Sequence, residues 1–257
     1  MLNQIANFFL LFSQDIVIIP MVILGFIWFN RNVFYHAICL ILLSMLFSAA
    51  LKVSFQKISS YGFCFPSGHM QAAVVFYGWL AYKFENRFLR IATLILLGGI
   101  GGGLFYLNYH DCVDILGGIF FAIIFLWGYV FALGITKRNM MWMTLFFASA
   151  FMLYIYLRYN QILPHLWLAY YALIGFTFSV RIFEQKIDLK SIAHKILATI
   201  LCFLIILISH SIFQAPFIHD LPAYLYQMKW IFIGISIPCS SFTSNVIIEI
   251  VSNKHYS

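Results

Sequence analysis

A short polar stretch, FPSGHMQ at residues 65–71, interrupts an otherwise apolar chain where a hydrophobic segment begins. Proline is favoured in the first turn of a helix, where its missing N–H removes no hydrogen bond. The next N–H groups, from Ser67, Gly68 and His69, would have no partner within that helix, and with the helix dipole they form a site for an anion such as phosphate. The His69 imidazole is placed to protonate a leaving oxygen. On its own, the pattern equally fits a helix cap with a locally bonded histidine.

A second polar cluster, NYHDCVD at residues 108–114, supplies complementary groups. His110 and Asp114 are four residues apart, so on a helix both side chains lie on one face. A carboxylate bonded to one imidazole nitrogen fixes the tautomer and leaves the other nitrogen free as a nucleophile. Asp111 is suited to cap the helix that begins there, which leaves Asp114 for the histidine. Because an acidic residue within a membrane span is unfavourable, Asp114 is a candidate functional residue.

The elements that would hold these residues are membrane helices. Of the 257 residues, 63% are hydrophobic and 9% are charged, and the mean hydropathy is +0.95. A soluble domain carries about 25% charged residues, so we expect an all-α polytopic membrane bundle instead. The net charge of +7 does not indicate nucleic-acid binding, because basic residues gather at the cytoplasmic ends of membrane helices and no basic stripe with interleaved aromatics occurs.

Nine apolar segments are long enough, at about 17–25 residues, to cross a membrane as helices. They lie near residues 5–29, 33–51, 66–82, 91–109, 112–135, 140–157, 163–183, 192–213 and 229–251. We expect residues 1–135 to form a catalytic membrane core, and residues 136–257 to form an additional transmembrane region of unknown role.

Lysine and arginine are divided unevenly between the two sets of alternating loops. Eleven of the 15 fall in one set: Arg31, Lys83, Arg87, Arg90, Lys137, Arg138, Arg181, Lys186, Lys190, Lys195 and Lys254. The other four are Lys52, Lys57, Arg158 and Lys229. Because positive charge accumulates on the cytoplasmic side, we expect the first set to be cytoplasmic. Both polar clusters then lie at the non-cytoplasmic face, where they can converge into one site.

The five cysteines have no metal-site spacing such as C-x-x-C. Cys64 and Cys112 each lie two residues from a motif residue, on the side where disulfides persist. The sequence leaves both a disulfide and two thiols open.

PSGH at 66–69, together with His110 and Asp114, resembles the second and third motifs of the type 2 phosphatidic acid phosphatase (haloperoxidase-related) superfamily over roughly residues 33–135. The resemblance implies that His110 attacks phosphorus to form a phosphohistidine, that Asp114 orients it, and that His69 protonates the leaving alkoxide. It further implies a phosphorylated membrane lipid as substrate, in a membrane such as the bacterial inner (plasma) membrane. We expect no metal and no other cofactor, because nucleophile, orienting group and acid are all side chains.

The chain departs from the family pattern in its cations. The Ser-Arg pair of the third motif would fall at positions occupied by Gly103 and Leu104. The Arg-Pro pair of the first motif, counted from Lys52, would fall at Ser59 and Ser60. Both motif arginines are therefore absent.

Phosphate binding is then expected from Lys52 and Lys57, with the N-terminal residues Ser67 and Gly68. Three functions stay open: hydrolysis of a lipid phosphate monoester or pyrophosphate, transfer of a phosphodiester headgroup as in sphingomyelin-synthase-like relatives, and an inactive relative that keeps the fold. A monoester carries a charge of about −1.5 to −2, whereas a diester has one fewer ionisable oxygen and needs fewer cations. A transporter is disfavoured, because the spans after residue 136 hold almost no charges. The lipid's identity and the oligomeric state are left open.

Overall fold

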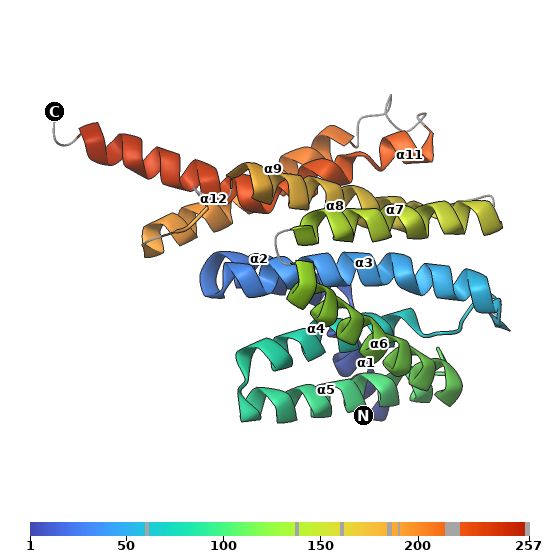
Figure 1. The fold of residues 1–257 in the computed structure, drawn as a ribbon. Helices are drawn as coiled ribbons and strands as arrows, with labels where there is room; N and C mark the ends of the chain where they lie inside the picture. The colour runs from blue at the N-terminus through green and yellow to red at the C-terminus, as the bar shows by residue number, and fades with distance from the viewer. Residues whose placement is uncertain are drawn as a thin grey trace. The chain divides into compact units, whose positions relative to one another are not determined.

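The computed structural model describes residues 1–59, 62–136, 139–159, 162–183, 187–189, 191–213 and 222–254, and these are almost entirely helical (Figure 1). The helices are α1 (Leu2–Leu11), α2 (Asp15–Leu24), the π-helix η1 (Gly25–Phe29), α3 (Arg31–Phe55), α4 (Gly68–Phe84), α5 (Arg87–Tyr106), α6 (Cys112–Thr136), α7 (Met140–Tyr159), α8 (Pro164–Phe183), α9 (Ile192–Phe213), α11 (Ala223–Tyr226) and α12 (Lys229–Lys254). A two-stranded antiparallel hairpin, β1 (Ile58–Ser59) with β2 (Gly62–Phe63), connects α3 to α4. Ser60 and four residues of the loop charge count (Lys137, Arg138, Lys186, Lys190) lie outside the described residues.

Seven segments among the described residues are long and apolar enough to cross a membrane: α3, α5, α6, α7, α8, α9 and Tyr224–Ile250. The pair of α1 with α2–η1, bent by 41°, makes an eighth if it is one span. The expected all-α polytopic bundle is therefore confirmed, whereas the count of nine spans is not. The expected span that is not counted is α4, which at 17 residues is at the short end of the roughly 17–25 that a crossing needs.

The N-terminal segment differs from its prediction as one continuous span at 5–29. It breaks between α1 and α2, where the polar residues Ser13 and Gln14 stand. The Ser13 hydroxyl donates to the carbonyl of Leu10 at 2.8 Å. This bond satisfies a carbonyl of the last turn of α1, where the helix ends.

The helices pack as two compact units. The first consists of Met1–Val22 and His36–Ile162, and the second of Ile23–Tyr35 and Leu163–Ser257. All the predicted site residues belong to the first unit. Its bounds differ from the expected functional division at residue 135, because α7 packs with the first unit. The predicted division into a catalytic core (1–135) and an additional transmembrane region (136–257) concerns the roles of the two parts, and it stays a prediction.

Helix α4 is the most deeply packed helix of the first unit. It contacts α5 and α6, and Trp79 and Phe76 on it are fully buried. At its far end Trp79 lies beside His36, whose Nδ1 is 2.9 Å from the hydroxyl of Tyr129 on α6. Near its start the Gln71 amide donates to a carbonyl of α3 at 3.3 Å. The N-terminus of α4, which carries the PSGH motif, is therefore held between α3 and α6.

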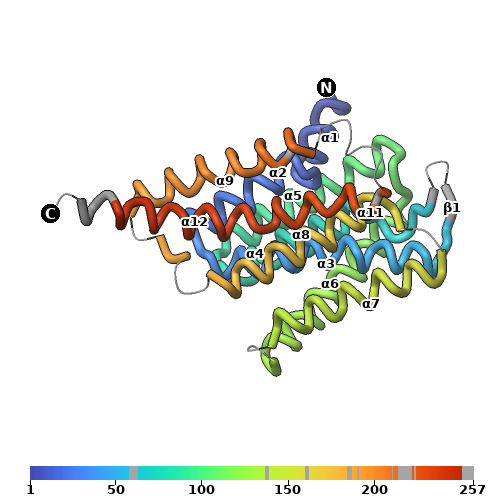
Figure 2. Tube along the Cα trace, turned by 90° about the horizontal axis from the view of Figure 1, so that it is seen from above, coloured from blue at the N-terminus to red at the C-terminus, as the bar shows by residue number. Residues whose placement is uncertain are grey.

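The second unit is built around α12, which lies along both α8 and α9 (Figure 2). The α8–α12 contact is close enough that a Cβ added at Gly175 or Gly234 would overlap backbone atoms of the other helix. Four buried serines of α12 line its packed side: Ser236, Ser240, Ser241 and Ser244. Small residues of this kind permit close helix packing in membranes.

Candidate active site

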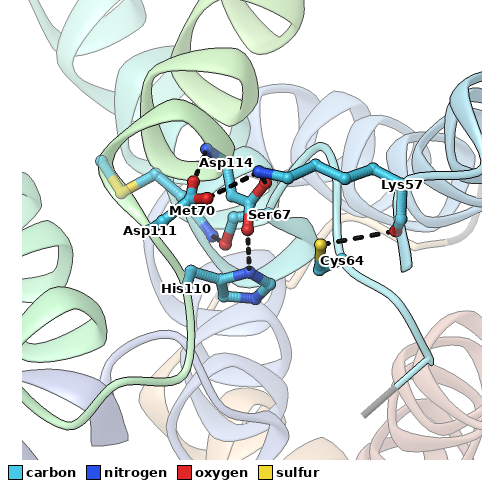
Figure 3. Close-up of polar contacts among 7 residues, drawn as sticks. All are labelled: Lys57, Cys64, Ser67, Met70, His110, Asp111 and Asp114. Carbon is cyan, nitrogen blue, oxygen red and sulfur yellow. Dashed lines mark hydrogen bonds and ion pairs between the residues drawn. The ribbon is translucent and has the colours of Figure 1, made fainter. Parts of the chain in front are cut away.

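Three chain segments of the first unit meet at the N-terminus of α4. These are the end of α3 with the hairpin, the start of α4 itself, and the turn that precedes α6 (Figure 3). The Ser67 N–H donates to the carbonyl of Asp114 at 2.9 Å, and Lys57 reaches Asp114 from the hairpin side. The PSGH motif and the H-x3-D motif are therefore adjacent, as their shared side of the membrane predicted.

The start of α4 corrects the expected role of Pro66. The helix begins at Gly68, and Ser67 is its N-cap, with its hydroxyl accepting from the Met70 N–H at 3.5 Å. Serine is a preferred N-cap because its oxygen satisfies an N–H of the first turn. Pro66 therefore precedes the cap, after a cis peptide bond from Phe65, rather than occupying the first turn.

Ser67 differs from the prediction in a second respect. Its N–H, expected to face a phosphate, is already bonded to Asp114, and the residue is fully buried. The N–H groups of Gly68 and His69 form no hydrogen bond with any described residue. The helix N-terminus therefore offers these two donors, with its dipole, to an anion.

Helix α3 brings a cation next to this N-terminus. A Cβ added at Gly68 would lie 3.3 Å from Ser48 Oγ and 3.8 Å from Lys52 Nζ, which are one turn apart on α3. Lys52 therefore lies where a phosphate bound at the Gly68 N–H would meet it. Ser48 Oγ is buried and bonded to none of the described groups. Ser48 was not among the predicted site residues, because one serine inside an apolar span has no motif signal.

The predicted dyad is present at the start of α6, with His110 in the turn before the helix and Asp114 in its first turn. His110 Nδ1 lies 3.4 Å from Asp114 Oδ2, at the long end of hydrogen-bond range. The side chains are 12% and 3% exposed, so the pair is largely shielded from water. Asp111 caps the helix as expected, with its Oδ1 accepting from the Asp114 N–H at 2.8 Å. The contact orients the ring so that Nε2 is turned away from the carboxylate.

Lys57 lies among carboxylates rather than beside Gly68. Its Nζ is 2.6 Å from Asp111 Oδ2 and 2.8 Å from Asp114 Oδ1. Figure 3 shows the Lys57 side chain reaching both acids, with the His110 ring on the other oxygen of Asp114. Lys57 was expected to contact phosphate. In this structure its ammonium instead forms ion pairs with Asp111 and Asp114.

These ion pairs shift two pKa values outside the spans. The Asp111 and Asp114 carboxylates raise the pKa of Lys57, and the Lys57 bond holds the pKa of Asp111 below its usual range. The Asp111 contribution to stability is present above about pH 3.9 and is lost as pH falls through its folded pKa. The Lys57 contribution is present below about pH 10.4 and is lost as pH rises through its folded pKa. The ion pair between Lys57 and Asp111 is therefore formed at all physiological pH values.

Burial lowers the pKa of His110, and the hydrogen bond to the Asp114 carboxylate offsets this only in part. The charges of Lys52 and His69 lower it further. The neutral, nucleophilic form of His110 is therefore the prevailing one at pH 7.

We expect His110 to react with diethyl pyrocarbonate, which attacks neutral imidazole, with a pH midpoint below the usual value of about 6.5. Because the folded pKa is lowered, the reactive form persists to more acidic pH and disappears only as pH falls through that pKa. Mass spectrometry of the His110 peptide measures the midpoint. A synthetic peptide of residues 108–114 is the unfolded reference, and a midpoint at or above that of the peptide contradicts the expectation.

Two glycines of α6 make room for the PSGH segment. A Cβ at Gly118 would lie 2.8 Å from the Ser67 carbonyl oxygen and 3.2 Å from Met70 Cβ, and one at Gly117 would overlap the Phe65 ring. The close approach of α4 to α6, and with it the Ser67–Asp114 bond, requires glycine there.

Gly118→Ala is expected to lower turnover about 100-fold, because displacing the α4 N-terminus by about 1 Å misplaces a bound phosphate. The matched control is Gly128→Ala on the same helix, where an added Cβ meets nothing within 4 Å. Turnover and thermal unfolding of the purified variants measure the effect. Equal turnover of the two variants would show that the close approach is not needed.

Cys64 and Cys112 are not joined by a disulfide. Cys64 is buried, and its Sγ donates to the Lys57 carbonyl at 3.4 Å, whereas Cys112 is exposed. The sequence left open whether Cys64 and Cys112 form a disulfide or remain two thiols, and in the structure they are thiols. The Cys64 contact fixes the backbone from which the Lys57 side chain extends.

The motifs, the dyad and the helix N-terminus all fall within one stretch of the chain. Residues 47–138 match the model of the PAP2 superfamily. The resemblance predicted from the motifs is thereby confirmed for this PAP2 segment, which begins in α3 and includes α4, α5 and α6. Comparison with curated proteins and with solved structures gave no match. With its apolar helices, the chain is a multi-pass membrane protein with a phosphatase-related segment.

Proposed function

We propose that the protein is a lipid phosphatase, which hydrolyses a lipid phosphate monoester or pyrophosphate through a phosphohistidine on His110. The active site faces the non-cytoplasmic side of a bacterial inner (plasma) membrane, as the lysine and arginine distribution favours. The observation that carries the proposal is the His110–Asp114 pair beside the N-terminus of α4, within the PAP2 segment.

The first chemical step transfers the phosphoryl group to the protein. The phosphate oxygens bind the N–H groups of Gly68 and His69 and the ammonium of Lys52, which stabilise the charge that develops. His110 Nε2 attacks phosphorus while Asp114 accepts the Nδ1–H, and the bond from phosphorus to the lipid oxygen breaks. The His69 imidazolium gives its proton to the departing alkoxide.

The second step releases the phosphate. Neutral His69 removes a proton from a water molecule, whose oxygen attacks phosphorus as the bond to His110 Nε2 breaks. His69 is exposed, which gives it access to water at the membrane surface. Inorganic phosphate leaves, and His110 returns to its neutral form.

One observation favours a second candidate, transfer of a phosphodiester headgroup between lipids. Lys57 is paired with Asp111 and Asp114. Among the residues that the structure describes, Lys52 is then the one cation beside Gly68 that forms no ion pair. A monoester brings a charge of about −1.5 to −2, but a diester brings one negative charge, which a single lysine balances. The hydroxyl of a second lipid would then replace water in the second step.

The test uses purified full-length protein in lipid nanodiscs with two phosphorus-labelled substrates, a phosphatidic-acid monoester and a choline diester with a hydroxyl lipid as acceptor. Free phosphate from the monoester supports the phosphatase. Labelled headgroup on the acceptor, without free phosphate, supports the transferase instead. Turnover of neither substrate, with no label on the protein, would contradict both and favour an inactive relative.

A further inference from the structure

Lys57 connects the hairpin to both acids of the α6 turn, and no motif predicts this role. The family's first-motif lysine corresponds to Lys52, which lies near Gly68. Lys57 instead holds Asp114 Oδ1 at 2.8 Å, while His110 Nδ1 lies on Oδ2 at 3.4 Å. The Asp114 carboxylate thus binds two partners, Lys57 through Oδ1 and His110 through Oδ2.

We propose that Lys57 is a positioning residue for His110 that acts through Asp114, and that it does not bind the substrate phosphate. The proposal rests on the proposed function, in which His110 is the nucleophile. Lys57 holds the carboxylate in the rotamer that presents Oδ2 to the ring. It also neutralises part of the carboxylate charge, so that Asp114 orients the imidazole while favouring its protonated form less.

The anchoring of Lys57 suits this role. Its carbonyl accepts from the Cys64 N–H at 3.0 Å and from Cys64 Sγ at 3.4 Å, so its backbone is held where the hairpin closes. Its ammonium is held at 2.6 Å by Asp111, the cap of α6. Both ends of the side chain are therefore fixed. A lysine that bound a mobile phosphate would need freedom at its charged end, which these two ion pairs remove.

The expected consequence follows from the charges around the dyad. Lys52 from α3, Cys64 from the loop after the hairpin, His69 from α4 and Asp111 from the α6 turn all face this region. Removing Lys57 leaves the buried Asp114 charge compensated mainly by His110. The protonated form of His110 is then favoured, and less of the neutral nucleophile is present near neutral pH.

The test compares Lys57→Gln, Lys57→Arg and Lys52→Gln in the full-length protein, with Lys83→Gln at the far end of α4 as control. The pH midpoint of His110 modification by diethyl pyrocarbonate is measured together with kcat and KM. Lys57→Gln is expected to raise the midpoint by about 1 pH unit and to lower kcat at pH 6 about 10-fold with KM unchanged. Lys57→Arg restores both values, Lys52→Gln mainly raises KM, and Lys83→Gln changes neither.

The opposite pattern would overturn the proposal. If Lys57→Gln raises KM as Lys52→Gln does and leaves the midpoint unmoved, Lys57 binds phosphate. Should Lys57→Gln fail to fold, Asp111→Asn keeps the helix cap and frees Lys57 for Asp114 alone, so the midpoint must fall rather than rise. A shifted midpoint in a protein without turnover would support the positioning role and count against the proposed function, so the two are separately testable.

Discussion

Replacing His110 by alanine is expected to abolish phosphate release from a labelled lipid phosphate, with a loss on the order of 10⁴-fold or more. The same change should remove the acid-labile label that the wild-type protein acquires during turnover. Both effects have one cause, because the Nε2 atom of His110 is both the attacking atom and the atom that holds the phosphoryl group. A loss of one without the other is therefore not expected.

The control is His194→Ala, a change at a half-buried histidine of the second unit. This variant should retain wild-type turnover and label, which shows that the effect is specific to His110. Thermal unfolding of His110→Ala checks that the variant is still folded when its turnover is lost. We expect it to be folded, because Lys57 still pairs with the Asp114 carboxylate when the imidazole is removed. Turnover that survives in His110→Ala would contradict the nucleophile assignment. Turnover by wild-type protein without label would point to direct attack by water.

The local parts of this site were predictable from the sequence. The four-residue spacing of His110 and Asp114 defines their contact, and Asp111 caps α6 because a short acidic side chain reaches the N–H of the first turn. The spans were predictable for the same reason, since length and hydropathy are local properties. The break in the N-terminal span was missed, because the average hydropathy of residues 5–29 stays high although the helix is interrupted between Leu11 and Asp15.

The convergence of the two motifs was predictable from the alternation of the loops, but the individual contacts between distant segments were not. Lys52 and Lys57 are five residues apart and were given the same role, but α3 ends between them. Lys52 therefore lies on the helix facing Gly68, whereas Lys57 lies on the loop that leads to the acids of α6. Likewise, the Ser67 N–H was expected to be open because helix geometry leaves it unpaired, but α6 supplies a carbonyl from 47 residues later.

Replacing His69 by glutamine is expected to lower turnover of a lipid phosphate about 10²- to 10⁴-fold, the usual contribution of a general acid. Glutamine keeps a polar side chain of similar length at the exposed position 69, but it cannot transfer a proton to the alkoxide. The backbone N–H of residue 69, which faces the phosphate position, is unchanged. The loss should therefore appear in kcat, with KM near the wild-type value.

A change of leaving group separates this role from a purely structural one. A nitrophenyl phosphate ester departs as a stable phenolate and needs no proton, so His69→Gln should phosphorylate His110 with this substrate at close to the wild-type rate. Its hydrolysis should remain slow, because the water that attacks phosphohistidine still lacks a base. The variant should therefore show a burst of nitrophenolate equal to one per protein, followed by a slow phase, with labelled His110 accumulating. Loss of the burst together with the slow phase would mean that His69 acts in building the site. Sustained fast release of nitrophenolate, with no slow phase and no accumulated label, would mean that another group activates the water, and His69 would then be an acid only.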